Sequence, residues 1–274
     1  MTNQLDAEEE EIEDEILVPE EEEKIIWPRY FMHISYDGTN YNGWQRQLNG
    51  KSIQAEIEGA LSKLLRVERV VTIGCGRTDS GVHARNFYLH FTIAKEIENI
   101  DDVFFKLNMM LPFDLGLYKL WQVHDKAHAR FDATERSYEY HIHRVRDPFV
   151  HQFSTFFPWP LDLEIMQKGA AKLLEYKDFA SFCKSRGGQR TTICDLRTAY
   201  WEILPDKLIF HITANRFLRN MVRAIVGTLL DLGRGRITLD EFVKVIEGKK
   251  RANAGDSAKP QGLHLTEVKY PFID

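Results

Sequence analysis

The sequence predicts an α+β fold built from two consecutive halves of similar layout. In the first half, segments with strand periodicity and segments with helical periodicity follow the order β-α-β-β-α-β, which is typical of a split β-α-β unit. The second half repeats this order imperfectly. A chain of 274 residues with 43% hydrophobic content can bury two such cores. We place the boundary near residues 124–134, between a domain at 25–126 and one at 127–274.

Each element of the first half has a local signal. Ser52 is a typical N-cap for a helix with an apolar stripe from Ile53 to Leu65. A second helix begins near Asp101 and ends at Leu111-Pro112, and we expect it to bury Val103, Phe104, Leu107 and Met110. Alternating or β-branched runs predict strands at 29–36, 70–73, 87–93 and 115–123.

The second half starts with a strand at 135–145 that places Tyr138 and Tyr140 on one face. Asp162 caps the next helix, and Thr238 with Glu241 forms a capping box for the last one, which ends at Gly248. Between them, residues 217–232 form a strongly apolar helix. Further strands are expected at 194–203, 207–213 and 263–270.

Charge is distributed unevenly along the chain. Residues 1–24 contain 12 of the 41 acidic residues and one base, so we expect a disordered acidic tail. The remainder has 35 basic and 29 acidic residues, which suits a polyanionic partner. The acidic N-terminus does not resemble a secretion signal, no apolar run is long enough to cross a bilayer, and the three cysteines lack paired spacing. These features predict a cytoplasmic protein without membrane association.

The stretch Gly74 to Ala84 is the strongest candidate for chemistry. It forms a glycine-rich turn between two predicted strands and contains Arg77, Asp79 and His83. A carboxylate presented beside an arginine can act as a nucleophile or stabilise positive charge. The alternative is that Asp79 only stabilises the turn with its side chain.

A second candidate is a row of arginines, Arg216, Arg219 and Arg223, spaced to lie along one side of the 217–232 helix. Apolar neighbours surround Arg223, and a buried guanidinium requires a carboxylate partner. Asp79 and Asp37 are both possible partners.

Metal and cofactor sites are not expected. His124 with His128, and His141 with His143, have no Cys or carboxylate at a matching spacing. The turn at Gly233-Arg234-Gly235 lacks the Lys-Ser/Thr ending of a phosphate-binding loop, and no dinucleotide-binding fingerprint occurs. The segment Tyr41 to Gln47 mixes aromatics, amides and an arginine, which indicates either a loop packed by its own rings or a surface for RNA bases.

Taken jointly, four motifs resemble the tRNA pseudouridine synthase A family over about residues 29–271. They are Tyr36-Asp37-Gly38 with Gly43-Trp44-Gln45, Gly76 to Ala84, His128 to Phe131, and Phe217 with Met221-Val222-Arg223. Ser80 and Ala224 depart from the usual alanine and asparagine of the family. Ser80 is a candidate hydrogen-bond donor to Asp79.

The resemblance implies a role for several residues. Asp79 matches the essential aspartate, Arg223 the arginine that pairs with it, Tyr138 the tyrosine that stacks on the target uracil, and Arg77 the arginine that helps displace the target nucleotide. The family's tRNA contacts fall on two segments here, with candidate residues His128, Arg130, Arg186, Gln189 and Arg190.

The resemblance also implies a fold, a partner and a reaction. Members have two related, ferredoxin-like halves that share a continuous antiparallel sheet, with the active-site cleft between them, and they act as homodimers. They isomerise uridine in the anticodon stem-loop of tRNA, at positions 38, 39 and 40, without a cofactor. Asp79 would either attack C1′ of the ribose or remove a sugar proton, and Arg223 is expected to keep it ionised.

Two other functions are compatible with the residues. A non-catalytic RNA-binding module would share the aromatic residues and the basic loops. A hydrolase that uses Asp37 and Asp79 as a carboxylate pair would release a free base or sugar and would tolerate replacement of Tyr138.

Overall fold

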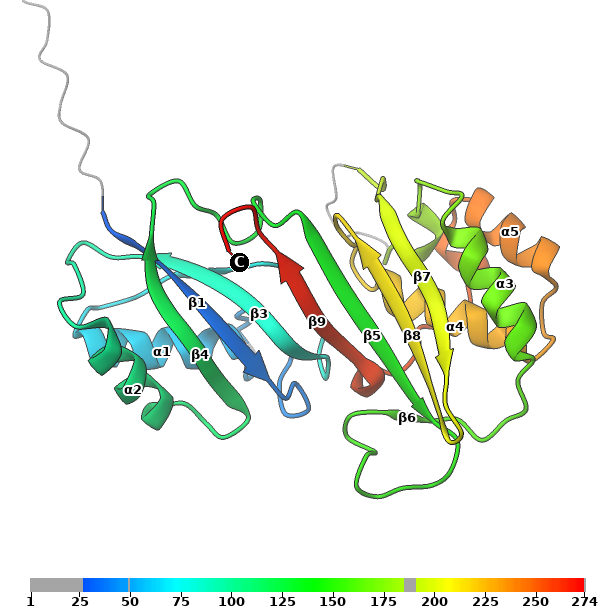
Figure 1. Cartoon of the computed structure of the whole chain (residues 1–274), viewed down its shortest axis with the longest axis horizontal. Helices are drawn as coiled ribbons and strands as arrows, with labels where there is room; N and C mark the ends of the chain where they lie inside the picture. The colour runs from blue at the N-terminus through cyan, green and yellow to red at the C-terminus, as the bar shows by residue number, and fades with distance from the viewer. Residues whose placement is uncertain (1–26, 49, 185–190, 274) are drawn as a thin grey trace, which may run out of the picture.

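A computed structural model describes residues 27–48, 50–184 and 191–273. The described residues form one nine-stranded sheet with helices packed against it (Figure 1). The strands are β1 (Arg29–Tyr36), β2 (Thr72–Gly74), β3 (His83–Thr92), β4 (Leu115–Val123), β5 (Glu135–His143), β6 (Thr155–Phe156), β7 (Leu196–Ile203), β8 (Lys207–Ala214) and β9 (Leu263–Lys269). The predicted acidic tail at residues 1–24 lies outside the described residues.

The two halves of the sheet have the same spatial order. The main path is β4-β1-β3-β9-β5-β8-β7, and β2 pairs with β3. The strands of the first half therefore lie in the order β4-β1-β3-β2, which is fourth, first, third and second along the chain. The second half gives the same order when β9, β5, β8 and β7 are taken as its fourth, first, third and second strands. The predicted mixed α and β architecture with a large sheet is confirmed.

The prediction of an entirely antiparallel sheet is wrong at the junction of the halves. There β3 and β9 pair in parallel, with His83 opposite His264 and Ala84 opposite Leu265. β5 and β6 are also parallel. Each half fixes the direction of its own edge strand through its antiparallel neighbours, and the two edges that meet happen to run the same way.

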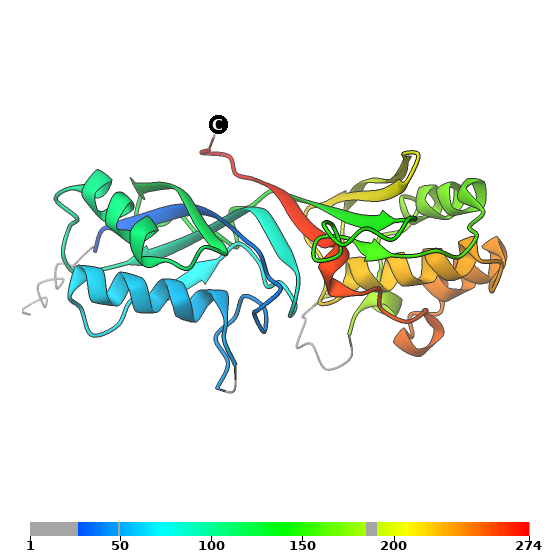
Figure 2. The same cartoon turned by 90° about the horizontal axis from the view of Figure 1, so that it is seen from below.

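Five α-helices occur among the described residues: α1 (Ile53–Leu65), α2 (Ile100–Met110), α3 (Leu163–Leu173), α4 (Met221–Gly233) and α5 (Leu239–Glu247). Short 3₁₀ turns lie at Ala180–Phe182, Arg251–Asn253 and Pro260–Gly262. The caps predicted at Ser52 and Asp162 and the capping box of Thr238 with Glu241 are present. Helices α1 and α4 lie on the same side of the sheet, one beneath each half (Figure 2).

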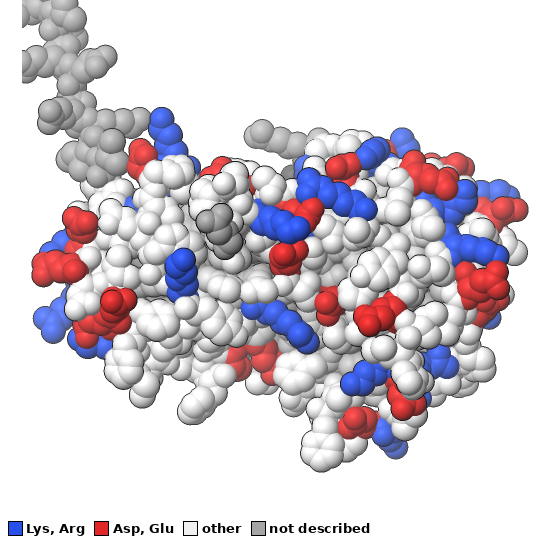
Figure 3. All heavy atoms as spheres, viewed as in Figure 1, with Lys and Arg blue, Asp and Glu red and all other residues white. Residues whose placement is uncertain are grey.

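Each half has its own hydrophobic core. The first contains Phe31, Ile57 and Phe87, and residues Leu265, Val268 and Tyr270 of the C-terminal segment also belong to it. The second contains Tyr140, Phe210 and Ile225. The ring of Tyr138 packs against both cores. The face of the sheet opposite helices α1 and α4 is seen in Figure 3, and it has mixed charges around an uncharged region.

Two helix predictions need correction. α4 begins at Met221 rather than at Phe217, because Asn220 adopts a left-handed conformation with φ 63° and ends the irregular segment before it. Arg216 and Arg219 therefore precede the helix. In α2 only Leu107 is fully buried, and Met110 is exposed because the helix covers the sheet with a narrow stripe. No helix in the described part of the chain is long and apolar enough to span a membrane.

Candidate active site

The loop that presents Asp79 connects β2 to β3 and is held by the segment after β1. The amide of Trp44 donates to the carbonyl oxygen of Thr78 at 3.2 Å, and the hydroxyls of Tyr36 and Thr78 are 2.9 Å apart. Gly43 has a φ of +90°, and a Cβ built there would lie 2.5 Å from the Thr78 carbonyl oxygen. Glycine is thus required for this close approach.

The same contacts decide how the segment Tyr41 to Gln47 is used. The rings of Tyr41 and Trp44 are buried, and Trp44 packs against Phe87 with 4.2 Å between ring centroids. These two rings are structural and are not available to stack on bases. The hydroxyl of Ser80 donates to the Tyr41 carbonyl oxygen at 3.1 Å, so the suggested bond from Ser80 to Asp79 is wrong.

Asp79 and Arg223 form an ion pair that links the two halves. Nη1 of Arg223 lies 3.2 Å from Oδ2 of Asp79, with side-chain exposures of 17% and 29%. Of the two carboxylates considered as partners of Arg223, the structure selects Asp79. Nε of Arg223 donates to the carbonyl oxygen of Ala258 at 2.7 Å, which fixes the orientation of the guanidinium.

Asp37 has different partners. Its Oδ1 accepts from the amide and hydroxyl of Thr39 and lies 3.1 Å from Nδ1 of His83. Asp37 and His83 line a hollow of about 480 Å³ whose lining does not include Asp79. His83 is buried as the first residue of β3, and burial lowers its pKa. These contacts hold Asp37 within its own turn.

Tyr138 lies on β5 next to the junction of the two cores. Its ring meets Phe217, which precedes α4, with 5.1 Å between centroids. Burial raises the pKa of Tyr138, and the negative charge of Asp79 acts in the same direction. The hydroxyl is therefore protonated at neutral pH and can donate a hydrogen bond.

Four arginines gather beside this site. Partial desolvation lowers the pKa of the Arg130 guanidinium, and the positive charges of Arg77, Arg136 and Arg216 lower it further. Arg77 and Arg130 are exposed. The guanidinium carbon of Arg130 lies 5.7 Å from the ring centroid of Phe131, which is 74% exposed. The exposed side chains of Arg77, Arg130 and Phe131 can bind phosphates and stack on a base.

The other predicted RNA-binding residues differ in their placement. Nδ1 of His128 accepts from the backbone amides of Arg130 and Phe131, so its ring shapes the loop that presents them. Burial lowers the pKa of His128. Arg186, Gln189 and Arg190 lie outside the described residues.

Sequence reasoning missed several contributors. Phe131 lies in a motif that carried the family resemblance but received no role of its own, and Arg216 was placed on a helix that starts later. Nothing in the residue types signalled Ala258 or Arg136. Ala258 acts through its own carbonyl oxygen, and the Arg136 side chain donates to carbonyl oxygens of other residues. Among residues 27–48, 50–184 and 191–273, no group of three or more His, Cys, Asp or Glu side chains could hold a metal ion.

Known proteins resemble this chain over most of its length. A family model described as tRNA pseudouridine synthase matches residues 170–271. A protein named tRNA pseudouridine synthase A from Bacteroides fragilis is 47% identical over 89% of this chain and 96% of its own length. Proteins of the same name from Parabacteroides distasonis and Lactococcus lactis subsp. cremoris are 46% and 38% identical over 89% and 90% of this chain, which is 96% and 98% of their own lengths.

Proposed function

This chain belongs to the tRNA pseudouridine synthase family and is an isomerase that acts on tRNA, and we propose that its targets are uridines of the anticodon stem-loop, at positions 38, 39 and 40. We further propose that Asp79 is its catalytic carboxylate. The observation that carries this second proposal is the ion pair of Asp79 with Arg223, which joins the two halves close to Tyr138.

The reaction needs a carboxylate in this environment. The C1′–N1 bond of uridine breaks, the uracil turns, and C1′ bonds to C5, with no net oxidation, reduction or hydrolysis. The sugar becomes electron-poor at C1′ as the base leaves, and an ionised carboxylate can stabilise that charge or bond to the carbon. Both routes require Asp79 to be charged, and the neighbouring guanidinium of Arg223 favours the charged form.

Tyr138 and Arg77 act on the target nucleotide in this proposal. The Tyr138 ring stacks on the uracil, which retains and orients the base after it has detached. Its hydroxyl can relay the C5 proton in the last step, accepting that proton at the oxygen as its own proton passes to water. The target must leave its stack at a cost of a few kcal/mol. Arg77 is exposed in the Asp79 loop, where it can occupy the vacated position.

The RNA contacts that we propose are made by the Ala127–Phe131 loop and by residues Arg186, Gln189 and Arg190. Arg130 supplies charge, and His128 supports the loop through its hydrogen bonds to the backbone. The nearby charges of Arg77, Arg136 and Arg216 add to the attraction for phosphate.

Several features of the assembly belong to the same proposal. Residues 25–126 and 127–274 are two ferredoxin-like domains, supported by the shared order of their strands, and the active-site cleft lies between them. The enzyme acts as a homodimer in the cytoplasm without a cofactor, as the family resemblance implies.

One experiment tests the catalytic proposal against its alternatives. Wild type, Asp79→Asn and Asp37→Asn are incubated with unmodified tRNA, and pseudouridine is mapped by carbodiimide treatment and primer extension. We expect product at the anticodon stem-loop with wild type and Asp37→Asn only, and tRNA affinity close to wild type in both variants. Asparagine retains the acceptor that Thr39 uses, so Asp37→Asn is a matched control.

Other outcomes identify the other functions. Binding without isomerised uridine indicates an RNA-binding module. Release of free uracil together with loss of activity in both variants indicates a carboxylate-pair hydrolase. Loss of tRNA binding in Asp79→Asn makes Asp79 a structural residue.

A further inference from the structure

Arg136 uses every N–H of its guanidinium on backbone carbonyl groups. Nε and Nη2 donate to the carbonyl oxygen of Cys75 at 3.3 and 2.9 Å. Nη2 also donates to Arg130 at 2.7 Å, and Nη1 donates to Ala133 at 3.0 Å and Asn215 at 2.8 Å. Arginine has five N–H donors, so all of its hydrogen-bonding capacity is used within the protein.

The four acceptors belong to the segments that surround the candidate active site. Cys75 lies in the loop that presents Asp79, four residues ahead of it in the chain. Arg130 and Ala133 belong to the loop with the exposed Phe131. Asn215 comes two residues before Phe217, whose ring contacts Tyr138. Arg136 therefore joins three segments from both halves of the molecule.

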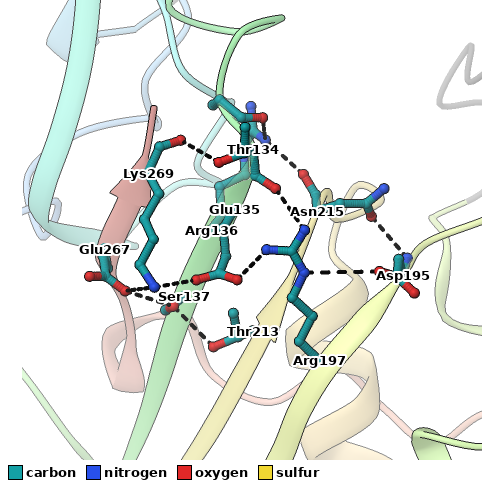
Figure 4. A network of polar contacts seen from close by, with 11 residues as sticks. Thr134, Glu135, Arg136, Ser137, Asp195, Arg197, Thr213, Asn215, Glu267 and Lys269 are labelled. Atoms are coloured by element: carbon teal, nitrogen blue, oxygen red, sulfur yellow. Dashed lines mark hydrogen bonds and ion pairs between the residues drawn. The ribbon is translucent and has the colours of Figure 1, made fainter. Parts of the chain in front are cut away.

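The position of Arg136 on β5 explains this reach. It precedes Tyr138 by two residues, so both side chains project from the same face of the strand. Figure 4 shows Arg136 at the start of β5 and its contact with Asn215. Asn215 is itself held by backbone and side-chain hydrogen bonds to Asp195. Placing Arg136 places Tyr138 as well.

The adjacent ionic contacts have a different character. Glu135 lies between Arg197 and Lys269, and its carboxylate pairs with both (Figure 4). No ion pair found among the described residues includes Arg136. A carboxylate partner would compete with the carbonyl groups, whereas its absence leaves the guanidinium free to bridge several segments. Lysine could replace the charge, but its three donors on one nitrogen cannot reach four carbonyl groups arranged around a planar guanidinium.

We propose that Arg136 is a positioning residue for uridine isomerisation, which sets the Asp79 loop, the Ala127–Phe131 loop and the Tyr138–Phe217 contact at their working distances. It acts through these segments and does not touch the substrate. This inference rests on the proposed function. Small displacements of reacting groups have large effects on rate, on the order of a hundredfold for 1 Å.

The test compares Arg136→Lys with Arg197→Lys, a matched control on β7 whose ion pair with Glu135 a lysine can retain. We expect Arg136→Lys to lower kcat by about tenfold to a hundredfold while KM stays within about threefold. Arg197→Lys should stay within about twofold of wild type in both constants. A guanidinium salt should partly restore kcat to Arg136→Ala, and methylammonium chloride at the same ionic strength should not.

Hydrogen exchange supplies a readout that does not depend on activity. Amides of residues 74–84 and 127–134 should exchange faster in Arg136→Lys than in Arg197→Lys, with the same exchange in α1. If wild type makes no pseudouridine, the proposed function fails, and the exchange data still decide whether Arg136 holds the loops. A wild-type kcat in Arg136→Lys would overturn the inference. So would a uniform loss of protection throughout the chain, or rescue by methylammonium.

Discussion

The ring of Phe217 meets the ring of Tyr138 edge-on, with 5.1 Å between centroids and 86° between ring planes. The two residues come from different elements, β5 and the segment before α4. Tyr138 also packs against the hydrophobic cores of both halves. These apolar contacts hold the ring without using its hydroxyl, so the hydroxyl can be removed with little effect on the placement of the ring.

The first prediction uses this separation of ring and hydroxyl. Tyr138→Phe should retain tRNA affinity and stability but lose about a hundredfold in the rate of product formation, because the hydroxyl that relays the C5 proton is absent. Tyr138→Ala should lose activity and also unfold at a lower temperature, since it removes a ring from the junction of the cores. Single-turnover assays and thermal unfolding measure the two effects.

The matched control is Tyr200→Phe, because Tyr200 lies on β7, is 44% exposed and stacks on His211. It should behave as wild type in both assays. A Tyr138→Phe variant with an unchanged rate would remove the hydroxyl from the proposed mechanism, and an active Tyr138→Ala would favour a hydrolase.

The sequence was sufficient for features that depend on local chemistry. β1 and β4 occupy their predicted ranges, residues 29–36 and 115–123. The side chains of the predicted helix caps Ser52, Asp162 and Thr238 accept hydrogen bonds from backbone amides of the first turn, because capping needs only residues within one turn. Asp79 was one of the two carboxylates predicted as possible partners of Arg223, since a partly buried guanidinium needs a carboxylate.

Features that depend on long-range geometry could not be predicted in this way. The parallel pairing of β3 with β9 depends on how two completed sheets meet. Arg136 donates to backbone carbonyl groups, and Ala258 accepts through its own. Every residue has a carbonyl group, so residue types do not reveal these contacts. The left-handed conformation of Asn220, which delays the start of α4, is likewise a result of the chain's path.

A second prediction concerns the support of Arg223. A Cβ built on Gly227 in α4 would lie 1.7 Å from the carbonyl oxygen of Asp256, so Gly227→Ala must displace the segment that ends in Ala258. We expect a loss of about 1–3 kcal/mol in the free energy of unfolding. The rate should also fall, since Ala258 orients Arg223.

Gly59→Ala is the control for this change. Gly59 is also in a helix, α1, and nothing lies within 4 Å of its built Cβ. Alanine there should leave the rate unchanged and stabilise the protein by up to about 1 kcal/mol. Denaturant unfolding measures the free energy of unfolding of both variants, and activity assays measure their rates. Equal stability and equal rates in Gly227→Ala and Gly59→Ala would contradict the steric argument.

A third prediction tests the RNA surface. Arg130→Ala should weaken tRNA binding and reduce the slope of log K against log salt by about 0.7 to 0.9, the value for one phosphate contact. The loop should keep its structure, because His128 bonds to the backbone of Arg130 and not to its side chain. The control is Lys168→Ala on α3, where Lys168 pairs with Glu164 in solvent. An unchanged slope in Arg130→Ala would exclude that side chain from phosphate binding.

A fourth prediction concerns acid stability. Burial lowers the pKa of both His90 and His264 to about 3, so both are neutral in the folded protein at neutral pH. Burial also lowers the pKa of other histidines, namely His33, His83, His128 and His143. Nδ1 of His90 accepts from the amide of Ala129, and Nε2 of His264 lies 2.8 Å from the carbonyl oxygen of Phe153.

The sign follows from proton uptake. In the unfolded chain these rings bind protons below their ordinary pKa of 6.5, whereas the folded protein resists protonation of His90 and His264 until about pH 3. The free energy of unfolding should therefore be constant above pH 6.5 and fall by up to about 1.4 kcal/mol per pH unit for each group below it. Urea unfolding between pH 4.5 and 6.5 isolates this effect, because carboxylates titrate mainly at lower pH. His264→Gln should show a shallower decline than wild type over that interval, and identical slopes would mean that His264 is protonated in the folded state.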